Sequence, residues 1–423
     1  MSAVDPRLLP ETAVVSPDGA LSIGGVAVSE LAARFGTPLF VYDEKHLRNR
    51  CRQAVAEFGE DGVVYATKAF LCGAMARLAH EEGLLLDVAT GGELFAATAA
   101  GVPAGRCVLH GNNKSTDELR LAITSGVNHI IVDSFDELDR LDALHVEGLP
   151  VPHVQLRITP GVHAHTHEFV STGQDDSKFG FNLANGDAMR AIERAKSSSS
   201  VVLTGIHCHI GSNVLDASLF AKASEVMVDL FRGLDLPELT LGGGLGVAYT
   251  AGDAAPTMRE WADAVRSATA SLPKGTKVRV EPGRSIVATA AVTVYTVGTV
   301  KRIEGIRDYI AVDGGMSDNP RPMMYGSPYE AFDPSRVPAD RPAHARIVGK
   351  HCESGDIVID DAAVPENVAV GDLLVTPVTG AYGYSMASNY NKVPRPAVVF
   401  VADGAARLVV RRETYEDLVR YDL

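Results

Sequence analysis

The sequence predicts an α/β protein that combines a closed (β/α)8 TIM-like barrel with a second, mostly antiparallel β domain. Between residues 44 and 285, short apolar runs alternate with helix-compatible segments of about ten to twenty residues, a rhythm typical of parallel βα units. Eight such units are the number that closes a barrel. After Arg284 the chain is rich in strand-forming residues with little helix between them. We therefore expect the barrel at residues 44–285, and the β domain at residues 1–43 together with 286–423.

The barrel prediction depends on eight short runs of strand-forming residues. Two helix starts between them support it, because Ser115 and Ser134 each stand three residues before a glutamate, the pattern of a capping box. An open doubly wound sheet is the rival architecture, but no Gly-x-Gly-x-x-Gly follows the first strand. The candidate strands are Val63–Lys68, Leu84–Thr90, Cys107–Gly111, His129–Ser134, Val154–Thr159, Leu203–Gly211, Leu239–Gly244 and Lys277–Arg284.

The second domain is predicted from a change of rhythm after the barrel. At the other end of the chain, Pro38–Tyr42 reads as a strand outside the barrel count, and we expect the first 43 residues to pack with the β domain. Glu44–Phe58 reads as an amphipathic helix. The candidate strands of the β domain are Ile286–Val300, Tyr309–Val312, Ala345–Val348, Asp356–Asp360, Leu373–Pro377 and Pro396–Val410.

Composition and charge narrow the possible partners. The chain has 423 residues and a net charge of −14, which argues against a nucleic-acid partner and against an anionic membrane surface. We expect no signal peptide, because Met1–Val15 lacks an apolar core, and no apolar run reaches the ~20 residues of a membrane helix. The five cysteines are scattered, which favours a cytoplasmic protein with free thiols.

Polar residues gather where the predicted barrel strands end. Because the carboxyl ends of barrel strands form the catalytic mouth of this architecture, we expect these side chains to lie together. One lysine, a glycine-rich turn, a carboxylate and a histidine are the groups that pyridoxal 5'-phosphate requires. In strand order the residues are Lys68, Asp87, His110, Asp133, Arg157, His207 with His209, Gly242–Gly244, and Glu281 with Gly283 and Arg284.

Each of these groups has a specific chemical use with that cofactor. Lys68 supplies the primary amine that condenses with the aldehyde. Gly243 and Gly244 let backbone N–H groups approach the phosphate, and Ser212 adds a hydroxyl. Glu281 beside the ring nitrogen keeps the ring protonated and hence a strong electron acceptor. Taken singly, each residue has a simpler explanation: a solvated lysine, a tight glycine turn, or, for His209, a hydrogen-bonded core histidine.

The ordered set of motifs resembles the fold-type III pyridoxal-phosphate-dependent decarboxylases. The resemblance runs from about residue 20 to the C-terminus, and the ordered set is far more specific than any single motif. The stretches that carry it are Tyr65–Phe70, Asp87–Glu93, His110–Ser115, His165–Glu168, Ser177–Gly180, His207–Ser212, Gly242–Gly246, Glu281–Arg284, Asp318–Pro322, Cys352–Asp356 and Gly380–Tyr382.

The resemblance implies a role for each site residue. It implies that Lys68 forms the covalent link to the cofactor, that His209 stacks on the ring, and that Cys352 supplies the proton that replaces CO₂. It also implies a homodimer with shared active sites, in which Cys352 and Glu353 reach the neighbouring subunit's site. The remaining cofactor-binding residues are Asp87, Ser212, Gly243, Gly244, Glu281, Gly283, Arg284 and Tyr382. The substrate-binding residues are Arg284, Arg321, Tyr325, Glu353 and Tyr382.

The expected reaction is the decarboxylation of meso-2,6-diaminopimelate to L-lysine and CO₂, the last step of lysine biosynthesis. Arg321, Tyr325 and Glu353 favour a substrate whose far end is a second amino-acid group. The alternatives are the same chemistry on ornithine, lysine, arginine or a carrier-bound glutamyl group, an amino-acid racemase, which Glu281 disfavours, and a non-catalytic carrier of the cofactor. The alternating histidines His163, His165 and His167 lack an obvious fourth ligand, so we expect no metal there.

Overall fold

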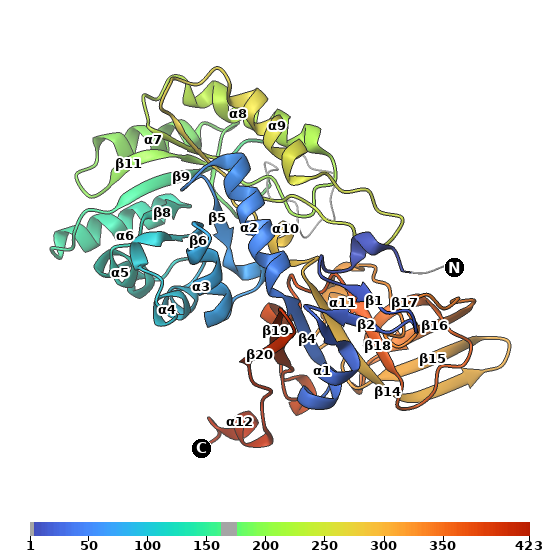
Figure 1. The fold of residues 1–423 in the computed structure, drawn as a ribbon. Helices are drawn as coiled ribbons and strands as arrows, with labels where there is room; N and C mark the ends of the chain where they lie inside the picture. The colour runs from blue at the N-terminus through green and yellow to red at the C-terminus, as the bar shows by residue number, and fades with distance from the viewer. Residues whose placement is uncertain (1–3, 162–175) are drawn as a thin grey trace. The chain divides into compact units, whose positions relative to one another are not determined.

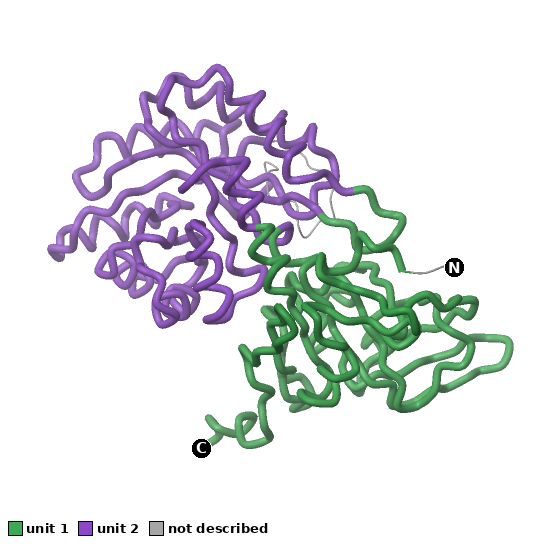
Figure 2. The backbone as a smooth tube through the Cα atoms, viewed as in Figure 1, with its two compact units in different colours: residues 1–50, 247–254, 286–423 green, residues 51–246, 255–285 purple. Residues whose placement is uncertain are grey.

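The computed structural model describes residues 4–161 and 176–423. The chain divides into two compact units (Figure 2). Unit 1 consists of Met1–Arg50, Val247–Ala254 and Ile286–Leu423, and unit 2 consists of Cys51–Gly246 and Ala255–Ser285. The histidines at positions 163, 165 and 167 lie outside the described residues, so the structure says nothing about them.

Unit 2 is the predicted parallel barrel. Its strands follow one another around the sheet in the order β13-β12-β11-β9-β8-β7-β6-β5, and every pairing is parallel. A parallel bridge between Val63 and Val280 joins the two ends, which closes the barrel. The eight strands are β5 (Val64–Ala66), β6 (Leu85–Val88), β7 (Cys107–Leu109), β8 (His129–Val132), β9 (His153–Thr159), β11 (Val202–His207), β12 (Glu238–Thr240) and β13 (Lys277–Arg279), and β10 (Phe181–Asn182) pairs beside β9.

Helices connect the barrel strands (Figure 1). The capping box at Ser115 is confirmed: its hydroxyl accepts from the Glu118 amide, and the Glu118 carboxylate accepts from the Ser115 amide. At Ser134 only the N-cap half of the box is confirmed: the hydroxyl accepts from the Glu137 amide, but the Glu137 carboxylate binds Lys114 and the Asp133 amide instead. The helices are α3 (Gly73–Glu81), α4 (Gly91–Ala99), α5 (Thr116–Ser125), α6 (Phe135–Val146), α7 (Asp187–Ser197), α8 (Ala217–Phe231) and α9 (Met258–Thr269).

Unit 1 is built on a mostly antiparallel sheet, as predicted. Its strand order is β17-β16-β15-β14-β4-β19-β20, with β18 paired to β14, and only β4–β19 and β15–β16 among its pairings are parallel. The apolar core of the unit includes Val41, Val292 and Val399, which are fully buried. The strands are β4 (Leu39–Asp43), β14 (Ala291–Ile303), β15 (Arg307–Val312), β16 (Ala343–Val348), β17 (Ile357–Val364), β18 (Leu373–Pro377), β19 (Ala397–Ala402) and β20 (Ala405–Val410).

Smaller elements complete unit 1. A three-stranded sheet precedes α1 (Val28–Phe35) and is formed by β1 (Val14–Val15), β2 (Leu21–Ile23) and β3 (Val26–Ala27). The predicted strand Pro396–Val410 is in fact a hairpin, because the chain turns at Asp403 and Gly404, both at positive φ. Two more elements are short: α11 (Arg321–Tyr325) and α12 (Tyr415–Val419). The remaining helices are α2 (Glu44–Phe58) and α10 (Arg284–Val287).

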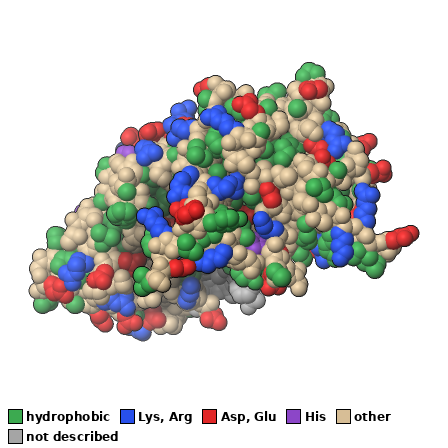
Figure 3. Space-filling view, turned by 90° about the horizontal axis from the view of Figure 1, so that it is seen from below, with side chains coloured by type: hydrophobic (Ala, Val, Ile, Leu, Met, Phe, Trp, Pro, Cys, Tyr) green, Lys and Arg blue, Asp and Glu red, His purple; other side chains and the backbone are tan. Residues whose placement is uncertain are grey.

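The surface carries charges of both signs. On the face drawn in Figure 3, basic and acidic side chains are interspersed. Among the described residues, none of the helices has the length and apolarity that a membrane crossing requires.

Candidate active site

A buried carboxylate with two histidines forms the centre of the candidate site in the barrel. Glu281 follows β13, and its Oε2 lies 2.9 Å from Nε2 of His207 at the end of β11. Its Oε1 lies 3.1 Å from Nε2 of His110, which follows β7. The same His110 nitrogen is 3.8 Å from Oδ1 of Asp87 on β6. All four side chains are buried, so the ends of four barrel strands supply one charged cluster.

The charge state of the cluster follows from these contacts. Burial raises the pKa of Glu281, but His207 and His110 outweigh burial and hold that pKa well below its usual range. Burial lowers the pKa of His110, yet Asp87 and Glu281 together raise it above the ordinary value. For His207, burial prevails and the pKa falls. Glu281 is therefore ionised, with His110, whose pKa is raised, beside one oxygen and a neutral His207 beside the other.

Lys68 lies on a turn at the end of the neighbouring strand. Lys68 is the last residue of the predicted strand, but β5 ends two residues earlier, at Ala66, and Thr67–Ala69 form a 3₁₀ turn that leaves Lys68 exposed. Burial and then the charge of Lys68 lower the pKa of His209 well below its usual range. His209 accepts a hydrogen bond from the Gly243 amide at 3.3 Å through Nδ1. The imidazole of His209 is therefore a neutral ring fixed beside the glycine turn.

The glycine turn Gly242–Gly244 has a packing reason that the sequence did not reveal. A Cβ at Gly243 would lie 1.9 Å from the Glu281 carbonyl oxygen, and one at Gly244 would lie 2.3 Å from the Gly211 oxygen. Gly242 and Gly244 also have φ of +58° and +116°. The adjoining strand ends therefore require glycine here. Close by in the sequence, Arg284 Nη2 donates to Ser212 Oγ at 2.9 Å.

Unit 1 holds the other predicted site residues. Arg321 at the start of α11 is buried, donates to the Tyr329 hydroxyl at 2.6 Å, and lies 4.4 Å from the ring centre of Tyr249. Burial lowers the pKa of Arg321, but Tyr329, Tyr249 and Tyr382 outweigh burial and raise that pKa above its ordinary value. Tyr325 ends the same helix. Sequence reasoning missed Tyr249 and Tyr329, because no local pattern connects residues so far apart along the chain.

Cys352 and Glu353 are both exposed on the turn between β16 and β17. Cys352 is therefore not an ordinary buried thiol. The Asp356 carboxylate anchors the turn, accepting from the amides of His351 at 2.8 Å and Met316 at 2.6 Å. His351 in turn places Nε2 2.8 Å from Ser317 Oγ. These contacts hold the Cys352 turn against the segment that leads into α11.

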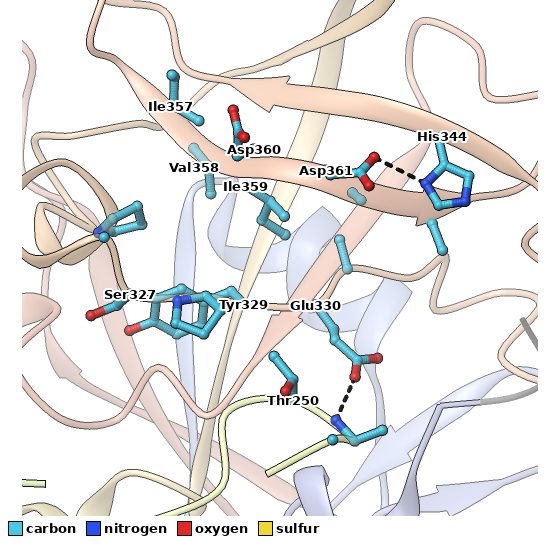
Figure 4. A pocket seen from close by; sticks show the side chains of 18 of the residues that line it. Thr250, Ser327, Tyr329, Glu330, His344, Ile357, Val358, Ile359, Asp360 and Asp361 are labelled. Atoms are coloured by element: carbon cyan, nitrogen blue, oxygen red, sulfur yellow. Dashed lines mark hydrogen bonds and ion pairs between the residues drawn. The ribbon is translucent and has the colours of Figure 1, made fainter.

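A cavity of about 850 Å³ lies within unit 1 (Figure 4). Strand β17 forms one side, and Tyr329 and Glu330 line it from the segment after α11. Glu330 accepts a hydrogen bond from the Ala251 amide at 2.8 Å, and His344 pairs with Asp361 at 2.9 Å. Glu330, His344 and Asp361 are thus already paired. Neither Lys68 nor Glu281 lines this cavity.

Fold and site together define a class of protein. A parallel barrel with a lysine after its first strand and an ionised carboxylate after its last is a scaffold for pyridoxal phosphate chemistry. The profile of the pyridoxal-dependent decarboxylases, in its pyridoxal-binding domain, matches residues 44–288. The chain therefore belongs to the pyridoxal-dependent decarboxylase family.

Individual proteins similar to this chain belong to one group within the family. The diaminopimelate decarboxylase of Bacillus subtilis (strain 168) is 48% identical over 426 residues, covering 96% of this chain and 95% of its own. That of Mycobacterium tuberculosis (strain H37Rv) is 46% identical over 439 residues, covering 99% and 98%. The crystal structure of the M. jannaschii diaminopimelate decarboxylase with L-lysine superimposes with a TM-score of 0.88 at 32% identity, covering 98% of each chain. Within its family, the chain is thus similar over its whole length to diaminopimelate decarboxylases.

Proposed function

We propose that this protein decarboxylates meso-2,6-diaminopimelate to L-lysine and CO₂ with pyridoxal 5'-phosphate, the last step of lysine biosynthesis. Full-length similarity to diaminopimelate decarboxylases supports the substrate. One observation on the chain itself carries the chemistry: Lys68 and the ionised Glu281 follow strands that pair at the closure of the barrel. The alternative is the same reaction on ornithine, lysine, arginine or a carrier-bound glutamyl group.

The residues at the barrel's strand ends suit this cofactor. Lys68 would hold it covalently through the aldehyde, and Glu281 would accept the N–H of the ring nitrogen. The neutral ring of His209 would stack on the cofactor. Asp87, Ser212, the glycines Gly243, Gly244 and Gly283, Arg284 and Tyr382 would complete its binding site. When bound, the cofactor supplies an electron-withdrawing ring that stabilises the carbanion left by departing CO₂.

The substrate's two ends need different partners. Arg284, Arg321, Tyr325 and Tyr382 would bind carboxylates, since guanidinium and phenol groups donate hydrogen bonds to them. Glu353 would bind the distal ammonium, and the Cys352 thiol would deliver the proton that replaces CO₂. Both residues are exposed on one turn that Asp356 anchors, so a substrate can reach them.

The direct test is a panel assay. Purified protein is offered meso-2,6-diaminopimelate, ornithine, lysine and arginine, and released CO₂ is measured with and without added cofactor. We expect release from diaminopimelate alone, with L-lysine as product, and nearly none from the Lys68→Ala variant. Release from a different amino acid would replace the substrate, and release from none would overturn the proposal.

We further propose a homodimer in which each site takes Cys352 and Glu353 from the neighbouring subunit, as the family resemblance implies. Lys68→Ala and Cys352→Ala chains should each be nearly inactive alone. After subunit exchange, random pairing makes half the dimers mixed, and one site in each mixed dimer is intact, so activity should recover to about a quarter of wild type. No recovery, with exchange shown by mass spectrometry, would mean that each site is built from one chain. The five free cysteines support a cytoplasmic location.

A further inference from the structure

The carboxylate of Glu281 is held more elaborately than a simple ring contact requires. Both of its oxygens are already engaged by imidazole nitrogens, at 2.9 Å for His207 and 3.1 Å for His110. The side chains of Glu281, His207 and His110 are 6%, 1% and 8% exposed. The two imidazole rings pack edge to face with centroids 5.2 Å apart. Burying three ionisable groups together is costly, and the apolar interior of a barrel does not need them.

The two histidines act on the carboxylate differently. His207 is neutral and gives Oε2 one hydrogen bond, while its Nδ1 is buried without a partner. His110 lies between two carboxylates, Glu281 and Asp87, which raise its pKa above the ordinary value. Arg157 adds positive charge nearby, and the Cys208 thiol stays neutral because burial raises its pKa to about 12. The cluster therefore offers Glu281 one orienting donor and one balancing charge.

We propose that His207 and His110 are positioning residues that hold Glu281 ionised and oriented, so that a proton shared with the cofactor's ring nitrogen stays on the nitrogen. This inference rests on the proposed function. A carboxylate buried alone gains proton affinity and would take the proton from a pyridine nitrogen. The hydrogen bond from His207 and the ion pair with His110 lower that affinity, because both stabilise the negative charge. The electron-accepting strength of the ring then depends on side chains that bind neither substrate nor cofactor.

The structure offers a closely matched pair of substitutions at His207. In His207→Gln the amide nitrogen occupies nearly the place of Nε2 and can still donate to Glu281, whereas in His207→Asn the amide falls about one bond short. His110→Gln keeps a polar side chain beside Oε1 but removes the imidazole that forms the ion pair. The control is His129→Asn, because His129 forms a comparable, partly buried pair with Glu238, 2.8 Å away, at the opposite ends of the strands.

The experiment measures ring protonation directly. Each holoenzyme is reconstituted with ring-¹⁵N pyridoxal 5'-phosphate, and the ¹⁵N chemical shift reports whether the nitrogen carries a proton. Binding of the cofactor to the apoenzyme and thermal unfolding are measured in parallel. We expect a protonated nitrogen in wild type, His207→Gln and His129→Asn, and a largely unprotonated one in His207→Asn and His110→Gln. In those two variants cofactor binding should weaken about tenfold, and kcat should fall at least tenfold with KM little changed.

A protonated ring nitrogen in both His207→Asn and His110→Gln would overturn the inference. If His207→Asn does not fold, His110→Gln decides alone, because it retains a polar side chain of similar size. The outcome is distinct from failure of the proposed function. If the proposed function fails, the wild-type chain binds no cofactor or releases no CO₂. If only this inference fails, the wild type is active and the ring nitrogen of the variants is protonated as in the wild type.

Discussion

The buried pair of Lys114 and Glu137 gives a stability prediction that the structure quantifies. Lys114 Nζ lies 2.8 Å from Glu137 Oε1 and donates to the carbonyls of Gly111 at 2.7 Å and Ile131 at 2.6 Å. The two charged side chains are 1% and 2% exposed. Replacing Glu137 by Leu leaves the ammonium buried without its counter-charge, which costs about 3–5 kcal/mol. Loss of the bond from the Asp133 amide adds about 1 kcal/mol.

The double variant Lys114→Met with Glu137→Leu is the informative control. Burial raises the pKa of Glu137 in spite of Lys114, so the attraction within the pair does not fully offset the desolvation of the carboxylate. We expect the double variant to lose only about 1–2 kcal/mol relative to wild type, less than either single variant. Urea unfolding is followed by helical circular dichroism, which reports the barrel because α3 to α9 lie in unit 2. A double variant whose loss of unfolding free energy equals the sum of the losses in the two single variants would refute this reasoning.

Two further predictions concern carboxylates of the barrel. Glu281→Gln should still bind the cofactor, but kcat should fall on the order of 10²-fold, since the ring nitrogen loses its charged partner; wild-type turnover in this variant would show that another group tunes the ring. For Glu238, burial raises the pKa, but hydrogen bonds and charge from His129 and Arg279 prevail and lower it to about 2. Because this pKa is depressed in the folded state, the stabilisation is fully present above a pH of about 4.5 and is lost as the pH falls towards 2. Acid unfolding of Glu238→Gln should therefore depend less on pH over that window, by on the order of 2 kcal/mol, and an unchanged pH dependence would count against the pairing.

The barrel could be predicted from the sequence because its signals are local. Each strand is a short apolar run. Because catalytic residues of a barrel lie at the carboxyl ends of its strands, the same runs also predicted where the site is, and Asp87, His110, His207 and Glu281 are found together there. What the sequence could not show is which of these groups pair. The spacing of His207 and His209 does not distinguish a histidine bonded to Glu281 from one bonded to the Gly243 amide.

Other misses have the same physical origin. Glu137 stands at a capping position in the sequence. Its carboxylate instead pairs with the buried Lys114, which lies between β7 and α5. From the sequence, Gly242–Gly244 suggested a close approach to a phosphate. In the structure, glycine is required there because neighbouring strand ends pass too close for a Cβ. The stacking of Arg321 on Tyr249 depends on two segments brought together by folding. Contacts between residues distant in sequence leave no periodic signal.

The most direct test of the account is the site of cofactor attachment. The holoenzyme is reduced with borohydride, digested, and searched by mass spectrometry for a phosphopyridoxyl group. The account predicts the label on the peptide that contains Lys68, and its disappearance in Lys68→Ala. A label on Lys114, Lys178 or any other lysine, with Lys68 unmodified, would contradict it.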